Sequence, residues 1–134
     1  MGSVSQVIVN GKLILVVDYA GCNEAEMIKL SNHLTVNLNE LPKGTPWLVL
    51  SCHENSFITG AFLRAAEKHT RENIHHLKKM AFTGIDPVKR IILKGYSFMF
   101  RRNFKSFNTR EEALAYLASD ETSDQDNEVN SRIG

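Results

Sequence analysis

The chain has 134 residues, of which 43% are hydrophobic and 23% charged, values typical of one globular domain with its own core. Two cysteines are too few for a disulfide framework, and no apolar run reaches the ~20 residues that a membrane-spanning helix needs. The first residues lack the basic start and apolar stretch of a secretory signal. We therefore expect a single-domain protein of the cytoplasm.

Charge is unevenly distributed along the chain. Residues 1–63 carry a net charge of −2, residues 64–110 a net charge of +9, and residues 111–134 a net charge of −6. The segment 119–134 is polar and acidic, so it buries too little apolar surface to offset the entropy of ordering. We expect the domain to span residues 4–118, and residues 119–134 to be a disordered acidic tail or one that docks weakly on the basic segment.

The first half of the chain predicts three strands and one helix. Residues 4–9 read as a strand, Asn10-Gly11 as a hairpin turn, and residues 13–17 as a strand buried on both faces. Asn23 with Glu26 forms a capping box, after which leucines recur at helical spacing up to Leu41. Residues 47–52 form a second buried strand.

The second half continues the alternation. A helix is predicted with one side formed by Ile58, Phe62, Ala65, Ala66 and His69, followed by a strand over 77–84. Asp86-Pro87 begins another helix, whose predicted apolar face consists of Val88, Ile91, Ile92, Gly95 and Met99. A short strand over 104–107 and a helix capped by Thr109 complete the chain.

This alternation defines the fold class. Short connections between strands and helices imply right-handed crossovers, and therefore a mostly parallel sheet of four or five strands covered by about four helices. The first strand follows a tight turn and is the expected antiparallel member.

The order of these elements resembles the small, stand-alone bacterial STAS/Sec14-like domains, which share the anti-sigma-factor-antagonist or SpoIIAA-like fold. The stretches that carry the resemblance are LILVVDYAGCNEAEMIKL, WLVLS, KKMAFTGIDPVKRIIL and FKSFNTREEALAYL, within about residues 8–118. The resemblance implies an α/β domain that is not an enzyme, holds no cofactor, and binds a partner protein or a small ligand. Relatives in the Sec14 branch bind lipids in an apolar pocket, so an anionic or amphipathic ligand is implied.

The resemblance also implies a phosphorylation site at the start of the helix after the third strand. The motif in such domains is acid-Ser-Ser-Gly, and Phe57-Ile58-Thr59-Gly60 occupies the matching place. Thr59 matches the phosphorylated position and Gly60 the glycine, whereas Phe57 and Ile58 depart from the motif. This departure weakens the expectation of a phosphorylation switch at Thr59.

The carboxyl ends of the parallel strands are the expected ligand site, because ligands of open α/β sheets collect there and helix N-termini favour anions. We therefore predict a ligand site formed by Asp18, Ser51, Ser56, Thr59, Gly60 and Phe62, with Ala61 beside Phe62 in its apolar wall. Ser56 has a purely structural alternative, as the N-cap of the following helix.

Catalysis and metal binding have little support in the sequence. Cys52 and His53 are adjacent on a strand and point to opposite faces, so Cys52 is expected to be a buried packing residue rather than a nucleophile. The residues His69, His75 and His76 are accompanied by no cysteine or acid in a metal-ligand pattern. A small enzyme with a site near Cys52 and His53 remains the weakest alternative.

The segment 96–107 supports a second alternative. Its sequence, YSFMFRRNFKSF, interleaves aromatic and basic side chains, as single-stranded nucleic-acid binders do. Packing of the aromatics with a solvated basic rim is the competing interpretation. Arg101 and Arg102 are the cations expected to contact a partner or an anion. A homodimer is a further assembly that this sequence allows.

Overall fold

The computed structural model describes residues 2–120, so most of the predicted acidic tail lies outside the described residues. Its five-stranded sheet has the order β1-β2-β3-β4-β5. The strands are β1 (Ser3–Val9), β2 (Lys12–Asp18), β3 (Trp47–Cys52), β4 (Leu77–Thr83) and β5 (Lys105–Phe107). The helices are α1 (Glu24–Asn39), α2 (Gly60–Asn73), α3 (Pro87–Phe100) and α4 (Arg110–Ala118), with a 3₁₀ turn at Ile74–His76. The predicted fold class is confirmed.

The β1–β2 hairpin is the antiparallel part of the sheet, as predicted, and the other three strand pairs are parallel. Asn10 has φ of 50° and Gly11 has φ of 76°, so both turn residues adopt the left-handed conformation that a two-residue type I′ turn requires. This turn matches the twist of the two strands and sets their register.

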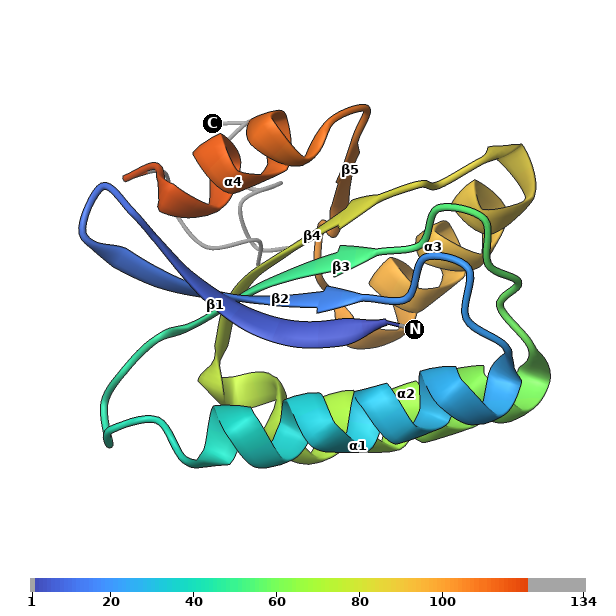
Figure 1. Ribbon diagram of the computed structural model, residues 1–134, viewed down its shortest axis with the longest axis horizontal. Helices are drawn as coiled ribbons and strands as arrows, with labels where there is room; N and C mark the ends of the chain where they lie inside the picture. The colour runs from blue at the N-terminus through green and yellow to red at the C-terminus, as the bar shows by residue number, and fades with distance from the viewer. Residues whose placement is uncertain (1, 121–134) are drawn as a thin grey trace.

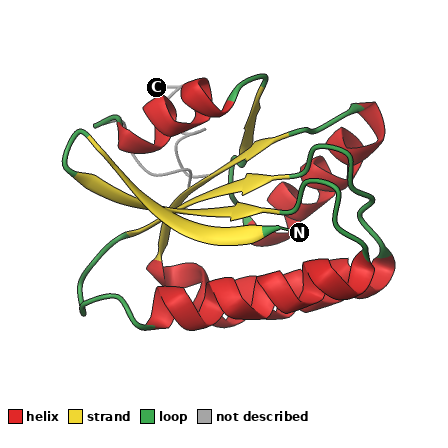
Figure 2. Ribbon diagram, in the orientation of Figure 1, coloured by secondary structure: helices red, strands yellow, loops and turns green. Residues whose placement is uncertain are grey.

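Helices cover both faces of the sheet (Figures 1 and 2). One face packs against α1, α2 and α3, through a core that includes Leu15, Val49 and Phe82. The other face packs against α4, through a smaller core that includes Ile14 and Leu50. Neighbouring residues of β2 and β3 thus enter different cores, as expected where side chains alternate across a strand. Every residue of β3 is buried.

Side-chain caps begin the helices. Asn23 and Thr109 form capping boxes with Glu26 and Glu112, and Asp86 caps α3 with Pro87 at its first position, as predicted. For α2 the alternative reading of Ser56 as the N-cap is wrong. Thr59 caps this helix by accepting from the Phe62 N–H at 3.3 Å, whereas Ser56 donates to the His53 carbonyl at 3.0 Å.

The predicted apolar face of α3 is also wrong except at Ile92, which faces the interior, because its other residues point outward. Val88, Ile91 and Met99 are 69%, 73% and 46% exposed, and a Cβ on Gly95 would meet nothing within 4 Å. Lys89 and Tyr96 are the residues that α3 buries, and they lie on the opposite side of the helix. The helix has two apolar stripes, and periodicity cannot tell which one faces the sheet.

Candidate ligand-binding cavity

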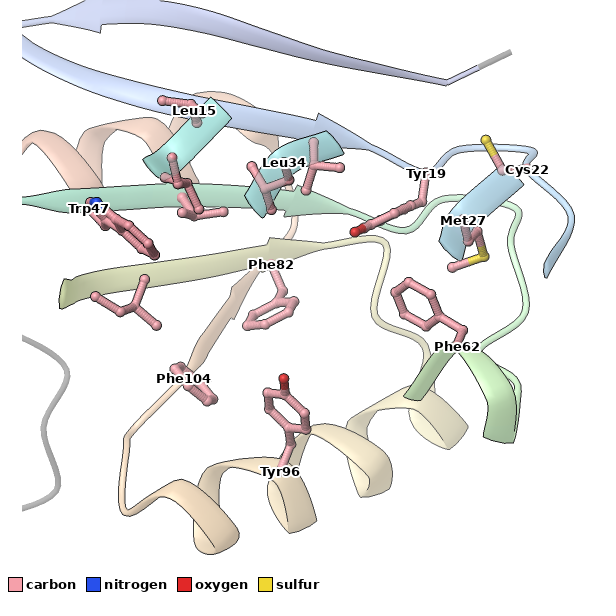
Figure 3. Packing of buried hydrophobic residues seen from close by; sticks show 14 residues of the cluster. Leu15, Tyr19, Cys22, Met27, Leu34, Trp47, Phe62, Phe82, Tyr96 and Phe104 are labelled. Atoms are coloured by element: carbon pink, nitrogen blue, oxygen red, sulfur yellow. The ribbon is translucent and has the colours of Figure 1, made fainter. Parts of the chain in front are cut away.

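A cavity of about 110 Å³ lies between the sheet and helices α1, α2 and α3. Most of its lining is apolar: Leu34 and Leu38 of α1, Phe62 and Ala66 of α2, and Leu93 of α3 face it, together with side chains of β3 and β4. In Figure 3, the rings of Tyr19, Phe62, Phe82 and Tyr96 converge from three elements and a strand end on this interior. Such an apolar interior with few polar groups is the usual composition of a small-molecule site.

The polar end of the cavity is formed by Ser51 and His53. The Ser51 Oγ and the His53 Nε2 are 2.8 Å apart, and both side chains are buried. The imidazole stacks on Tyr19, with ring centroids 4.9 Å apart, and lies parallel to Phe82 at 6.0 Å. The His53 Nδ1 is buried and has no hydrogen-bond partner among the described residues. A buried polar atom without a partner is costly, so it is a natural contact for a ligand.

His53 is uncharged at neutral pH. Burial and the nearby Lys89 ammonium lower its pKa to about 4, although Glu54 opposes the shift. Loss of solvation disfavours the imidazolium, and the Lys89 charge disfavours it further. The ring therefore offers one hydrogen bond at Nδ1, as donor or acceptor according to its tautomer.

Lys89 brings a buried cation to the same end of the cavity. Its Nζ donates to the His53 carbonyl at 2.7 Å and to the Gly84 carbonyl at 3.2 Å, and lies 4.0 Å from the Asp86 carboxylate. The side chain comes from the first turn of α3, which Asp86 and Pro87 begin. One partly exposed carboxylate at this distance neutralises the ammonium incompletely, so an anion in the cavity would find an attractive potential.

The backbone that carries His53 depends on Gly84. This glycine has φ of +70°, and a Cβ on it would lie 2.7 Å from the His53 carbonyl carbon and 2.4 Å from the Glu54 nitrogen. The loops after β3 and β4 can approach this closely because Gly84 has no side chain. This contact holds both acceptors of the Lys89 ammonium in place.

The tyrosine hydroxyls of the cavity are already engaged. The Tyr96 hydroxyl donates to the Ala66 carbonyl at 3.1 Å and lies against Thr70, and the Tyr19 hydroxyl is hydrogen-bonded to Ser31. Burial raises the pKa of Tyr96 to about 12 and that of Tyr19 further, so both remain protonated. These hydroxyls tie α1, α2 and α3 together rather than offering free contacts.

The structure brings only part of the predicted ligand site to the cavity. Ser51 and Phe62 line it. Ser56 lies behind it, on the His53 carbonyl, and Thr59 and Gly60 form the start of α2 outside the lining. Phosphorylation of Thr59 is not tested by the contacts of the described residues and stays a prediction.

Asp18 lies on the other face of the sheet. Its two carboxylate oxygens each accept from Arg110 at 3.2 Å, and Arg110 also contacts Glu54 at 3.3 Å. The Ala20 N–H donates to the same carboxylate at 3.0 Å. These contacts join the end of β2 to the start of α4, so Asp18 has a structural role and is not part of the cavity.

Sequence reasoning missed His53, Tyr19 and Lys89. For His53 a signal is present in the sequence, because residues two apart on a strand share a face and the spacing of Ser51 and His53 could have indicated that they lie side by side. Cys52, the neighbour of His53 in the sequence, is buried in the α4 core on the opposite face, as predicted. No local pattern placed Lys89, because an amphipathic helix normally keeps lysine in solvent.

The histidines considered as metal ligands are used otherwise. A ring nitrogen of His69 lies 2.7 Å from the Asn32 side-chain oxygen, and the rings of His75 and His76 lie against each other at an angle of 43°, with centroids 4.0 Å apart. Among residues 2–120, no cluster of three histidine, cysteine or acidic side chains could hold a metal ion. None of the helices described is long and apolar enough to span a membrane.

The two arginines predicted to contact a partner differ. Arg102 is 5% exposed and donates to the Ile74 and Leu77 carbonyls at 2.8 and 2.6 Å, so its guanidinium anchors the end of α3 and the prediction for it is wrong. Arg101 is exposed and ends α3 in the left-handed conformation, with φ of 55°. Of the neighbouring aromatics, Tyr96 and Phe104 are buried, whereas Phe98 is 87% exposed.

No family model and no curated protein matches the sequence. Several solved structures are similar in fold, among them the following three. An anti-sigma-factor antagonist (STAS) domain protein from Planctomyces limnophilus matches with a TM-score of 0.59 and 14% identity, over 87% of this chain and 98% of that one. An uncharacterized protein of the DUF3478 family with a SpoIIAA-like fold, from Shewanella loihica PV-4, matches with a TM-score of 0.62 and 12% identity, over 87% and 93%. An RsbS variant from Moorella thermoacetica matches with a TM-score of 0.56 and 16% identity, over 85% and 93%.

These matches identify the class of fold. The chain has the SpoIIAA-like fold of STAS domains, a single α/β domain with a mostly parallel five-stranded sheet. The predicted resemblance is confirmed at the level of the fold. Function does not follow from fold alone.

Proposed function

We propose that this chain is a non-enzymatic, STAS-like regulatory module that binds a small amphipathic ligand with one anionic group. The observation that supports this most directly is the apolar cavity with His53 Nδ1 unpartnered at one end and the Lys89 ammonium beside it. The ligand's anionic group would contact these two residues. Its apolar part would lie between α1, α2 and the sheet.

The size of the cavity limits the ligand. Its volume of about 110 Å³ is somewhat smaller than an engineered protein cavity of about 150 Å³ that binds benzene. A ligand held in this conformation therefore has a short apolar part, on the order of six non-hydrogen atoms. A longer chain would need α3 or α2 to move outward.

The Ser51–His53 pair supports binding better than catalysis. A serine nucleophile needs a base that accepts its proton, and a third group that orients the base. With a pKa lowered to about 4, His53 is a weak base, and its Nδ1 contacts no carboxylate among the described residues. We therefore do not assign hydrolysis to this pair.

Titration with hexanoate and with 1-hexanol, followed by calorimetry, tests the ligand proposal. We expect hexanoate to bind and 1-hexanol, which lacks the charge, to bind at least about tenfold more weakly. Ala66→Phe would fill the cavity and abolish binding, whereas Ala65→Phe, one position along α2 and outside the lining, would leave it intact. Equal hexanoate affinities of Ala66→Phe and Ala65→Phe would contradict the proposal.

A protein partner is supported by a separate observation, the outward face of α3. Val88, Ile91 and Phe98 are exposed along one side of this helix, and exposed apolar stripes mark interaction sites. Arg90, Lys94 and Arg101 are exposed on this helix and at its end, and residues 87–107 contain no acid, so the partner's surface would be acidic. Arg101 stays in this proposal as an exposed cation at the end of the stripe.

Crosslinking in cells of the source organism tests the partner proposal. We expect a specific protein crosslinked near α3 in the wild type and lost in Phe98→Ser with Ile91→Ser. Val36→Ser, at an exposed apolar residue of α1, serves as the control and would keep the crosslink. Capture of nucleic acid instead, lost steeply with salt, would favour the alternative of nucleic-acid binding by 96–107.

Two further proposals concern a modification site and the location of the protein in the cell. Phosphorylation of Thr59 is supported by the position of this half-buried residue at the N-terminus of α2, where backbone N–H groups favour a phosphate. A phosphate mapped to Thr59 by mass spectrometry of protein from its own source would support this proposal, and the absence of phosphate under all growth conditions would contradict it.

Location in the cytoplasm is supported by Cys22 and Cys52, neither of which forms a disulfide.

A further inference from the structure

The outer edge of the sheet at β1 is long and unprotected. β1 (Ser3–Val9) pairs with β2 along all seven of its residues without a bulge, and no described strand lies on its other side. Its sequence, SVSQVIV, contains no charged residue, proline or glycine. Natural proteins normally protect such an edge with charges, proline, a bulge or a very short strand. β1 has none of these devices.

The opposite edge of the same sheet is protected. β5 (Lys105–Phe107) has three residues, and the Lys105 ammonium lies 4.8 Å from the Tyr116 ring centroid of α4. A short strand that carries a lysine discourages pairing with another chain. The contrast between the two edges shows that this fold can protect an edge, and that β1 is left available for pairing.

We infer that β1 pairs with β1 of a second copy of this chain, in antiparallel orientation about a two-fold axis at Gln6. This places Ser5 opposite Val7 of the partner subunit and Val4 opposite Ile8 of the partner subunit. The two sheets would join into one of ten strands. The inference is independent of the ligand and the protein partner proposed above.

The partner is a second copy because the edge complements itself. In a two-fold pairing each residue meets a residue of the same strand, and β1 has no charge that would be opposed by its like. Ile8, which is 72% exposed and lies on the face that α1 covers, would gain an apolar neighbour in Val4, which already packs against that core. Cross-strand pairs of β-branched residues stabilise antiparallel sheets.

A charge-swap experiment tests the geometry. Gln6 is exposed and sits at the proposed axis, so Gln6→Lys places two ammonium groups opposite each other, and Gln6→Glu places two carboxylates there. We expect the wild type to sediment as a dimer, and each variant alone to weaken dimerisation by about tenfold or more. An equimolar mixture of the two variants would recover the dimer. Ser106→Lys on the opposite edge is the control and would leave it unchanged.

A covalent version distinguishes this interface from other dimers. In Gln6→Cys the two thiols would face each other at antiparallel pairing distance, so oxidation by added disulfide reagent would give a disulfide-linked dimer, with the reagent's disulfide reduced in exchange. Cys22 and Cys52 are buried and would not compete. A monomer at all concentrations, or a dimer that neither Gln6 charge disturbs, would overturn the inference, as would capture of β1 by a strand of another protein.

Discussion

His53 is the residue on which the cavity depends, because its side chain and its backbone serve different neighbours. The ring contacts Ser51, Tyr19 and Phe82, and the carbonyl accepts from both Lys89 and Ser56. A change at Lys89 therefore removes a hydrogen bond to the His53 backbone without touching the ring.

Lys89→Met is expected to remove the anion contact. The variant removes the Lys89 hydrogen bonds to the Gly84 and His53 carbonyls, of which the His53 carbonyl keeps Ser56 as a donor, and this costs about 1–3 kcal/mol of the free energy of unfolding. Hexanoate affinity should fall about tenfold or more, measured by calorimetry below the unfolding transition. Lys89→Arg, which keeps the charge, should retain part of that affinity. Unchanged hexanoate affinity in Lys89→Met would exclude Lys89 as the anion contact.

Gly84→Ala should destabilise the protein far more than Gly11→Ala. Both glycines have positive φ, so both substitutions cost about 1–2 kcal/mol of backbone strain. At Gly84 the new Cβ also meets the backbone of His53 and Glu54, whereas at Gly11 it meets nothing within 4 Å. Urea unfolding of the two variants measures the difference. Equal losses would mean that the two loops separate at little cost.

Only some of the single residues that form the candidate site could be predicted from the sequence. Ser51 follows from strand alternation, and Phe62 from the spacing of α2. Asp18 was misplaced because the carboxyl end of a strand defines an edge of the sheet but not a face, and Arg110, its partner, is 92 residues away. Lys89 required the tertiary structure, since only the close approach at Gly84 creates its acceptors.

Single elements were predictable wherever the signal is local. Caps at Asn23, Asp86 and Thr109, the Asn10-Gly11 turn and the strand Trp47–Cys52 were all predicted from neighbouring residues and are confirmed. For α3 the choice between two apolar stripes depends on Tyr96 and Arg102, which reach α2 and the Ile74–Leu77 segment. Such long-range contacts leave no periodic mark in the sequence.

A pair of phenylalanines tests this orientation of α3. Phe98 is 87% exposed and Phe104, just after the helix, is 6% exposed against Phe82 and Tyr96. Phe98→Ala should change the free energy of unfolding by less than about 0.5 kcal/mol, whereas Phe104→Ala should lower it by about 3–5 kcal/mol. Chemical denaturation of both variants measures this. A large loss in Phe98→Ala would mean that α3 packs with its other face inward.

In the whole molecule, α3 links the two binding functions proposed above. Its inner face supplies Ile92, Leu93 and Lys89 to the cavity, and its outer face carries the exposed stripe with Phe98. A ligand larger than the cavity would press on this helix, and a partner on the outer face would resist its displacement. Binding of the ligand is therefore expected to change the affinity for the partner. Binding of the partner must then change the affinity for the ligand by the same factor.

The stability of the whole molecule should depend on pH through His53. In the unfolded chain the imidazole has its ordinary pKa of about 6.5, whereas burial and Lys89 lower the pKa of His53 to about 4 in the folded protein. Between these values the unfolded state binds the proton and the folded state does not, so stability falls as pH falls from about 6.5 to 4. The loss is about 2 kcal/mol by pH 5 and about 3 kcal/mol by pH 4.

Urea unfolding at pH 7 and pH 5 measures this dependence, with His53→Gln as the variant that cannot titrate. The variant should be less stable than the wild type at pH 7, since it alters the contact with Ser51 and the ring stack, but its stability should change much less between the two pH values. His33→Gln, at an exposed histidine of α1, should keep the wild-type slope. An unchanged slope in His53→Gln would show that groups other than the buried imidazole bind the protons on unfolding, and would contradict the lowered pKa of His53.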